Sequence, residues 1–187
     1  MHGFVMLMLV ASSCFWIGGC SPDADDEIVR VSSAGQVHEL KRLLAEGADP
    51  NTVVIREETA LTAAARNGHA NAVGALLAAG ADADQQVDHG CTALSLAAEV
   101  GHALVVKVLL EGLADAEIPG QGGNTALMAA AANGHATVVQ HLLRFGADTR
   151  ARNDDGRTAG EIASEREHVG IVQLLENAEV EADTRTP

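Results

Sequence analysis

Aromatic side chains are scarce in this sequence of 187 residues, which contains no tyrosine, one tryptophan and three phenylalanines. Trp16, Phe4 and Phe15 lie within the first twenty residues, so Phe145 is the only aromatic residue in the rest of the chain. Sites that stack nucleotide bases or sugar rings need aromatic faces. The scarcity therefore argues against nucleic acid and carbohydrate as partners.

Basic residues are also few, because 12 Lys and Arg stand against 26 Asp and Glu and give a formal net charge of -14. Nucleic acids and anionic lipids are polyanions, which an acidic surface repels. We therefore expect no nucleic-acid partner. The charge is compatible with a basic protein partner, and a surface that only aids solubility is the alternative interpretation.

Cysteine occurs only at positions 14, 20 and 91. The first lies in an apolar leader and the second is a candidate for lipid modification, which leaves Cys91 alone in the folded part. No intramolecular disulfide is then available, so the fold must be held by apolar packing. The hydrophobic fraction of 47%, much of it Ala, Leu and Val, favours helices with small packing faces.

The first twenty residues lack Asp, Glu, Lys and Arg. Their apolar stretch, 4–17, is short for a membrane span and has the length of a signal-peptide core. The sequence "IGGC" at 17–20 resembles the lipobox of bacterial lipoproteins, although no Lys or Arg precedes the apolar core. The resemblance implies a signal peptide at 1–19, a lipid on Cys20 as membrane anchor and, with Ser21, an outer-membrane lipoprotein on the periplasmic side of the bacterial cell envelope. A plain cleaved signal and an uncleaved anchor are the alternatives.

The rest of the chain is an internal repeat. Three features recur every 33 residues: Gly-His pairs at 68, 101 and 134, threonines at 59, 92, 125 and 158, and valines at 73, 106, 139 and 172. Segments such as "TALTAAARNG" predict a short helix with threonine near its start. Segments such as "HANAVGALLAAG" predict a second helix that ends at glycine. The "AD" stretch and the next "DHG", "GGN" or "DDG" predict a loop and a tight turn.

Two helices and a turn every 33 residues are typical of ankyrin repeats, and the chain resembles ankyrin-repeat proteins over 27–178. The resemblance implies an all-α solenoid of about five stacked helix-turn-helix repeats joined by tight turns. We expect units at about 27–53, 54–86, 87–119, 120–152 and 153–178, a polar stem at 20–26 and a flexible tail at 179–187.

The chain departs from the family pattern in two ways. The family's Thr-Pro-Leu-His signature occurs as "TALT", "TALS" and "TALM", so these helices are expected to lose a rigid first turn and one side-chain hydrogen bond. In the third unit Leu113 takes the place of the helix-ending glycine, and Pro119 and three glycines follow it. We therefore expect an irregular or mobile turn over 112–123.

The recurring histidines raise the question of a metal site. Two histidine nitrogens on one zinc lie only about 3.5 Å apart, whereas helices of stacked units lie about 8–10 Å apart. We therefore expect no metal site. Each histidine is interpreted as the residue that begins the second helix and hydrogen-bonds locally at the turn between the helices.

The stretch "VDHGCTA" at 87–93 is the most enzyme-like part of the sequence. Asp88, His89 and Cys91 suggest a thiolate paired with histidine, but one exposed turn supplies neither a pocket nor an orienting third group. "GQGGN" at 120–124 lacks the lysine and the preceding strand of a phosphate-binding loop. We expect no catalytic residues and no cofactor, and interpret Cys91 as an incidental thiol, with redox sensitivity as the alternative.

The resemblance also implies a concave surface, formed by turn tips and first-helix positions, that holds partners. The matching partner-binding candidates are Arg56, Glu58, Arg66, Asn67, Asp88, His89, Glu99, Val100, Gln121, Asn124, Asn133, Asp154, Asp155 and Arg157. This face is polar, mixed in sign and free of the Trp and Tyr that dominate hot spots, so we expect the partner to supply aromatic or basic anchors.

We therefore predict a non-catalytic protein-binding module that is monomeric on its own. The chain resembles small exported ankyrin proteins of bacteria, some of which are associated with oxidative-stress systems and others of which are immunity proteins that neutralise toxins. An accessory protein of an oxidative-stress system, an immunity protein, and a structural envelope protein without a specific client are the alternatives.

Overall fold

The computed structural model describes residues 22–54 and 58–185, and these residues form ten α-helices in five consecutive pairs. The pairs are α1 (Pro22–Ser33) with α2 (Val37–Ala45), α3 (Ala60–Arg66) with α4 (Ala70–Ala78), α5 (Ala93–Val100) with α6 (Ala103–Glu111), α7 (Ala126–Ala132) with α8 (Ala136–Arg144), and α9 (Ala159–Glu165) with α10 (Val169–Arg185). The predicted all-α solenoid of stacked helix-turn-helix units is confirmed.

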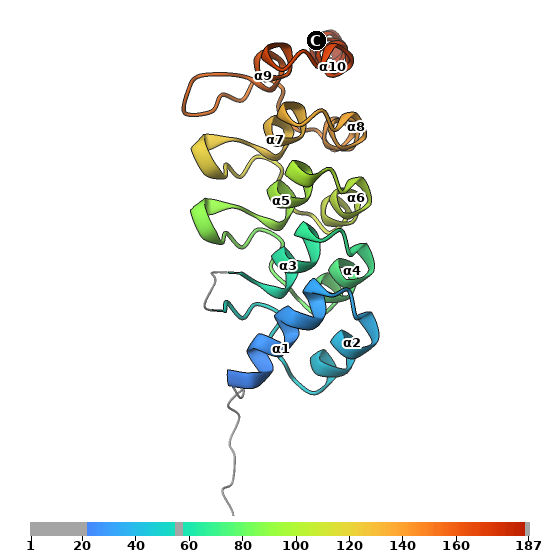
Figure 1. Cartoon of the computed structure of the whole chain (residues 1–187). Coiled ribbons are helices and arrows are strands. Elements are labelled where there is room, and N and C mark those ends of the chain that lie inside the picture. The colour runs from blue at the N-terminus through green and yellow to red at the C-terminus, as the bar shows by residue number, and fades with distance from the viewer. Residues whose placement is uncertain (1–21, 55–57, 186–187) are drawn as a thin grey trace, which may run out of the picture.

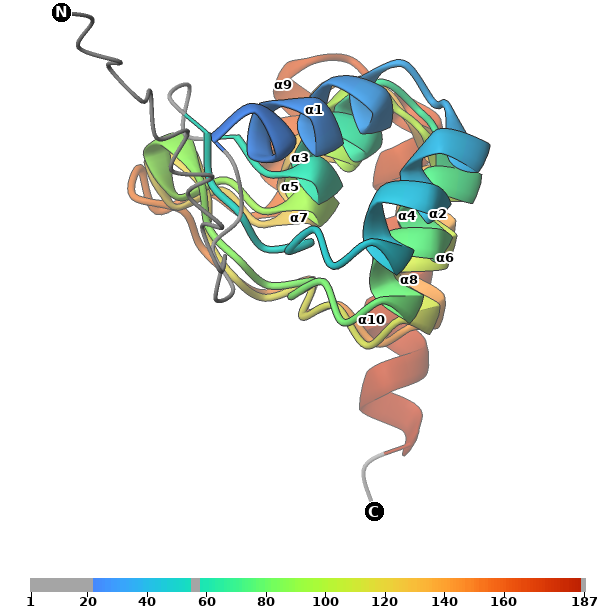
Figure 2. The ribbon, with the colours of Figure 1, turned by 90° about the horizontal axis from the view of Figure 1, so that it is seen from below.

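The helices form two rows, which are seen side by side in Figure 1. Odd-numbered helices pack on one another in an inner row, and even-numbered helices pack in an outer row. Between units the chain projects away from both rows in finger loops (Figure 2). Three of them, residues 84–91, 117–124 and 150–157, are described in full, and of the one before α3 only residues 51–54 and 58 are described. Short 3-10 turns, Asp88–Gly90 and Gln121–Gly123, occupy two of the fingers. Single β-bridges pair Val53 with Thr59 and Val87 with Cys91.

The periodic threonines start the inner helices. The Thr59 hydroxyl accepts the backbone N–H of Thr62 at 3.1 Å, and the Thr62 hydroxyl accepts the N–H of Thr59 at 2.9 Å. Thr92 and Ser95 form the same reciprocal cap, which satisfies backbone donors that a helix start leaves free. The expected loss of a side-chain hydrogen bond is therefore wrong for "TALT" and "TALS". It holds for "TALM", because Met128 has no hydroxyl group.

Small apolar side chains fill the space between the rows. The leucines of the inner helices and the valines at 73, 106 and 139 of the outer helices are buried, with Leu61, Leu94, Val73 and Val106 at most 2% exposed. Four consecutive buried positions of α3 are Thr62 and three alanines. Because alanine has no bulk beyond Cβ, short helices of adjacent units pack closely and still exclude water.

The Gly-His pairs link each unit to the preceding one. The Nε2–H groups of the four histidines that begin outer helices donate to backbone carbonyl oxygens of the preceding unit: His69 to Ser33 and His135 to Glu99 at 3.0 Å, His102 to Arg66 at 3.0 Å, and His168 to Ala132 at 3.2 Å. Each ring lies against the glycine of that unit, since a Cβ on Gly101 would lie 2.6 Å from the His135 ring. The predicted local hydrogen bond is therefore wrong, because the imidazole is long enough to span to the next layer.

The first unit has only the glycine of the Gly-His pair, and the last unit has only the histidine. Gly35 receives the ring of His69, but Gln36 follows it where a histidine stands in later units. At the other end, His168 donates to the fourth unit, and the residue before it is Glu167 with φ +60. A first unit needs no histidine that reaches backwards, and a last unit needs no glycine that receives one.

Both ends of the described chain are more helical than expected. α1 begins at Pro22 and so includes most of the predicted stem at 20–26, because proline suits a first helical position and acidic residues favour a helix N-terminus. α10 runs to Arg185 through most of the predicted tail at 179–187, since no glycine or proline interrupts 171–186. Figure 2 shows α10 extending past the other outer helices. The predicted signal peptide and Cys20 lie outside the described residues.

The turn after α6 keeps the hydrogen bonds of the turn after α4, so the expected irregularity is not seen in its hydrogen bonding, and mobility over 112–123 stays a prediction. The backbone N–H groups of Leu113 and Ala114 donate to the last turn of α6 at 3.1 and 3.0 Å, as those of Gly80 and Ala81 donate to α4. Leu113 achieves this by adopting the left-handed conformation with φ +66, which an L-residue with a Cβ enters only with strain.

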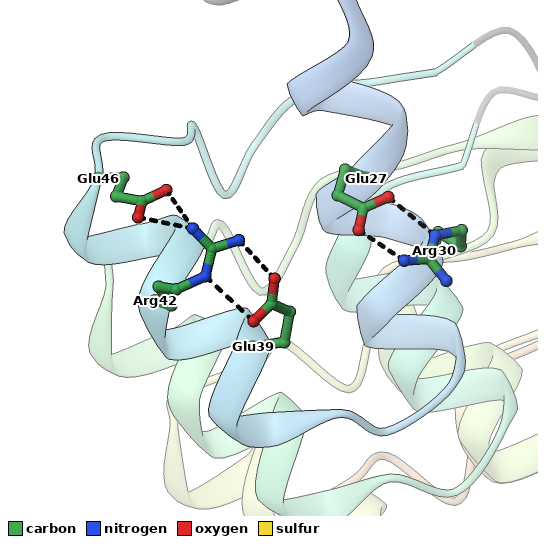
Figure 3. A network of polar contacts seen from close by, with 5 residues as sticks. All are labelled: Glu27, Arg30, Glu39, Arg42 and Glu46. Carbon is green, nitrogen blue, oxygen red and sulfur yellow. Dashed lines mark hydrogen bonds and ion pairs between the residues drawn. The ribbon is translucent and has the colours of Figure 1, made fainter.

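The first unit carries ion pairs on its exposed side (Figure 3). Glu27 pairs with Arg30 on α1, and the guanidinium of Arg42 bonds to both Glu39 and Glu46 along α2. These hydrogen bonds to arginine lower the pKa values of Glu27 and Glu39. A polar outer face suits a terminal unit, which no neighbour covers. Among the described residues, no helix is long and apolar enough to cross a membrane.

Candidate functional site

A hollow of about 240 Å³ lies where the last three finger loops meet the inner helices α5, α7 and α9. Its floor is apolar, with Met128 at 1% and Ile162 at 7% exposure. Its rim is polar and carries Glu99, Asn133 and Arg166, one from the end of each of the three helices. An apolar floor with a few polar groups around it is the composition of a binding surface.

The regular stacking of the inner helices brings these residues together. Asn133 and Arg166 are the residues that follow the last turns of α7 and α9, and Glu99 lies in the last turn of α5. The histidines that begin α8 and α10 bond to the same helix ends, because His135 donates to the carbonyl oxygen of Glu99 and His168 to that of Ala132. The hydrogen bonds that hold the units together therefore also fix the spacing of the rim.

Three of the predicted binding residues are asparagines that hold helix or loop ends. The Asn67 amide donates to the Ala63 carbonyl at 2.8 Å, and the Asn133 amide donates to the Ala129 carbonyl at 2.9 Å. Asn124 donates to the Gln121 carbonyl within its own finger at 2.9 Å. Each side chain stabilises the end of a helix or loop, so substituting it would disturb the surface as well as any contact to a partner.

The predicted residues of the last finger are also engaged within the protein. Arg157 donates to Asp155 at 2.7 Å and to Glu165 at 2.6 Å, and these two carboxylates raise its pKa. The backbone N–H of Asp154 donates to the Gly122 carbonyl at 3.1 Å, which joins this finger to the preceding one. The fifth unit therefore presents a preorganised wall to the hollow.

Other predicted residues remain accessible. Arg66 and Glu58 lie 3.8 Å apart at the two ends of α3, and Asp88 and His89 form an exposed pair at 3.2 Å on the finger loop 84–91. None of these four residues lines the hollow. Val100 is 48% exposed, Gln121 lines the hollow, and Arg56 lies outside the described residues.

Sequence reasoning missed the floor of the hollow. Met128 and Ser95 occupy the same position of consecutive inner helices, three residues after the capping threonine, and Ile162 follows that position in α9. The signal was present in the repeat, because Thr62, Ser95, Met128 and Glu161 are 33 residues apart and differ in chemistry. A helix-start position does not by itself indicate a binding floor.

The hollow offers little for catalysis. Cys91 is half-buried on its wall, but His89 pairs with Asp88 at the exposed tip of the finger. A nucleophile needs a base within hydrogen-bond reach and a third group that orients the base. Among the residues that the structure describes, no group of three or more His, Cys, Asp or Glu side chains could hold a metal ion.

Stacked pairs of short helices joined by projecting loops define a helical-repeat protein, built to present one continuous surface along the stack. The family model for ankyrin repeats (three copies) matches residues 28–119 and 106–186, and the chain belongs to the ankyrin-repeat family. Repeats of this family are protein-protein interaction modules and are typically non-catalytic scaffolds. A comparison with curated proteins finds no match.

Proposed function

We propose that this chain is an exported, lipid-anchored protein of the bacterial envelope that binds a protein partner in the hollow over α5, α7 and α9, without catalysis. The supporting observation is that two charged side chains on the rim of the hollow have no partner within the described part of the chain. The side chains of Glu99 and Arg166 make no hydrogen bond or ion pair within the described part of the chain, although both line the hollow. Charges that the fold leaves unpaired at the edge of an apolar floor are available to a partner.

The composition of the hollow suggests what the partner supplies. The floor is made of Met128 and Ile162, and no aromatic residue lines the hollow. Hot spots are enriched in Trp, Tyr and Arg, so the partner contributes the large side chain that enters. Rim groups of both signs fix its orientation more than its affinity.

Site-specific photocrosslinking in intact cells tests the binding surface. A photoreactive amino acid at position 99 is compared with one at Lys107, an exposed residue of the outer helix α6. We expect a discrete protein adduct from position 99 only. No adduct at 99, or the same adduct from 107, would contradict the assignment of the hollow.

Affinity measurements with the captured protein then test the rim. Glu99→Ala and Arg166→Ala should each weaken binding about fivefold or more, since an interface charge pair contributes about 1 kcal/mol or more. Asn133→Ala is a poorer probe, because the Asn133 amide holds the end of α7.

The anchor needs a separate experiment. Cells labelled with radioactive palmitate should incorporate label into the native protein and not into Cys20→Ala. Because the substitution leaves the array intact, the variant should still bind the partner in extracts. An unlabelled native protein would remove the lipoprotein proposal and leave the binding proposal standing.

A further inference from the structure

Two large apolar side chains are exposed next to each other on the outer side of the array. Leu113 is 87% exposed and Phe145 is 46% exposed, and both line a hollow of about 320 Å³ together with Leu110 and Ala147. This Leu113–Phe145 hollow lies beyond the C-terminal ends of α6 and α8. The hollow over α5, α7 and α9, the inner-helix hollow, is formed by other residues, which lie in the inner row and the finger loops.

The chain departs from its own repeat at both positions. Gly47, Gly80 and Gly146 occupy the place of Leu113 in other units, with φ of +97, +89 and +87. Leu113 holds a left-handed conformation that glycine adopts without strain, and its side chain faces solvent. Phe145 stands where the three preceding units have Glu46, Ala79 and Gly112. Neither side chain is needed to complete the turn, so their exposure calls for a role outside the fold.

Carboxylates line the same hollow. Asp115 accepts the backbone N–H of Glu117, and Glu117 accepts the backbone N–H of Asp148, both at 2.9 Å. No lysine or arginine lines this hollow, and within the described residues neither carboxylate pairs with one.

Lys107, Arg144 and Arg150 do not line this hollow. Lys107 lies 3.6 Å from Glu111 on α6, and Arg144 and Arg150 line an adjoining depression between α8 and α10, which shares Gly146 and Ala147 with the Leu113–Phe145 hollow. The Leu113–Phe145 hollow is therefore apolar at its centre and negative at its edge.

We propose that the Leu113–Phe145 hollow is a second protein-binding surface, which takes a cationic segment with one large apolar side chain. The apolar side chain enters between Leu113 and Phe145, and neighbouring Lys or Arg residues face Asp115 and Glu117. The net charge of -14 repels a second copy of the chain and an anionic membrane. Charge complementarity therefore selects a basic protein segment as the occupant.

A defined peptide tests the surface. Fluorescence anisotropy measures binding of the full chain to a labelled synthetic peptide in which leucines are flanked by lysines. Leu113→Gly should raise the Kd about tenfold or more, because the burial of a leucine side chain is lost. Leu104→Ala removes an equally apolar side chain, 64% exposed at the start of α6, and should leave the Kd unchanged.

Leu113→Gly also guards against misfolding as an explanation, because it restores the residue that other units use at this turn. Asp115→Asn and Glu117→Gln keep the oxygen atoms that accept backbone hydrogen bonds. These variants should weaken binding and reduce its salt dependence. A peptide with serine in place of leucine should bind more weakly by the same factor as Leu113→Gly.

Four results would overturn the proposal: unchanged binding by Leu113→Gly, equal weakening by Leu104→Ala, equal affinity for the serine peptide, or no binding of the leucine peptide at all. Sedimentation that shows Leu113-dependent self-association would assign the surface to a second copy. Leu113-dependent binding to vesicles of anionic phospholipid would assign it to a membrane. Partner capture at position 99 is independent of all these outcomes.

Discussion

His135 donates a hydrogen bond to the carbonyl oxygen of Glu99 at 3.0 Å, and its ring lies against Gly101, two residues further along the chain. One imidazole thus uses both features of the preceding turn, its free carbonyl and its lack of a Cβ. Because Glu99 also stands on the rim of the inner-helix hollow, the contact that joins two units also positions a residue of the binding surface.

This contact predicts different costs for two glycines with the same backbone conformation. Gly101 has φ +90 and Gly80 has φ +89, but a Cβ on Gly101 would lie 2.6 Å from the His135 ring, whereas one on Gly80 would meet nothing within 4 Å. Gly80→Ala should lower the free energy of unfolding by about 1–2 kcal/mol through backbone strain alone. Gly101→Ala should cost about 1 kcal/mol more, because the histidine must give up its hydrogen bond.

Urea unfolding followed by circular dichroism measures both variants. The excess cost of Gly101→Ala should shrink when His135→Ala is also present, since the ring is then gone. Equal losses for the two single variants would mean that the ring moves aside freely.

Ser32 supplies a prediction of the opposite sign. Its hydroxyl is fully buried and finds no hydrogen-bond partner among the described residues, whereas the next three units have alanine at this place, Ala65, Ala98 and Ala131. Ser32→Ala should raise the free energy of unfolding by about 1 kcal/mol or more, because an unsatisfied buried polar group is removed.

The same substitution at Ser95 should destabilise the chain. The Ser95 hydroxyl accepts the backbone N–H of Thr92 and donates to the Thr92 carbonyl, both at 3.0 Å. Loss of this cap should cost about 1 kcal/mol. Thermal unfolding of the two variants should therefore shift the midpoint in opposite directions, and shifts of the same sign would contradict both assignments.

Glu161 predicts a pH dependence. Its carboxylate accepts the backbone N–H of Thr158 at 2.8 Å, and this hydrogen bond, with a smaller contribution from Arg152, lowers its pKa. A carboxyl group with a lowered folded pKa stabilises the protein fully above its unfolded pKa. That contribution is lost as the pH falls through the folded pKa, which places the loss below about pH 4.

Glu161→Gln isolates this effect from general acid unfolding. Wild type should exceed the variant in unfolding free energy at neutral pH. The difference should shrink as the pH falls below the ordinary pKa of a glutamate, about 4.3, and vanish once Glu161 is protonated in the folded chain. A difference that stays constant over this range would show that the charge of Glu161 does not stabilise the cap.

Leu113 and Glu167 predict that two substitutions to glycine stabilise the chain. Both residues have left-handed backbone conformations, with φ +66 and +60, which cost about 1–2 kcal/mol for a residue with a Cβ. Glycine removes that strain but orders a more flexible chain on folding. The net gain in unfolding free energy should be up to about 1 kcal/mol for Leu113→Gly and Glu167→Gly, measured by urea titration. A loss at Leu113 alone would show that its side chain packs usefully in the folded state.

The periodic residues made the fold predictable, because each determines the local backbone structure within a few residues. Thr92 caps a helix, and glycine ends one, within a few residues of sequence. The partner of His102 was not predictable in the same way. The Arg66 carbonyl lies 36 positions earlier, and only the separation and rotation of stacked units decide which atom the ring meets.

The partner-binding role of the candidate residues stays a prediction. Glu99 lies on the rim of the hollow, and its place at a helix end could be read from the sequence because that position is shared by all units. The sequence did not show that Asn67 and Asn133 hydrogen-bond to carbonyl groups at helix ends. An asparagine amide can donate to a backbone carbonyl or to a partner protein, and the sequence does not distinguish the two. Met128 was missed because a hydrophobic residue at a helix start is more often core than floor.

The half pairs at the two ends determine where this array can gain length. A copied unit inserted between existing ones carries a histidine that lies against the glycine of the preceding unit. It also carries a glycine that leaves room for the histidine of the following unit, so a duplicated interior unit keeps all of these contacts. Beyond α10 the same copy would meet the Cβ of Glu167 where Gly134 leaves room for a ring. Glu167→Gly would remove that clash.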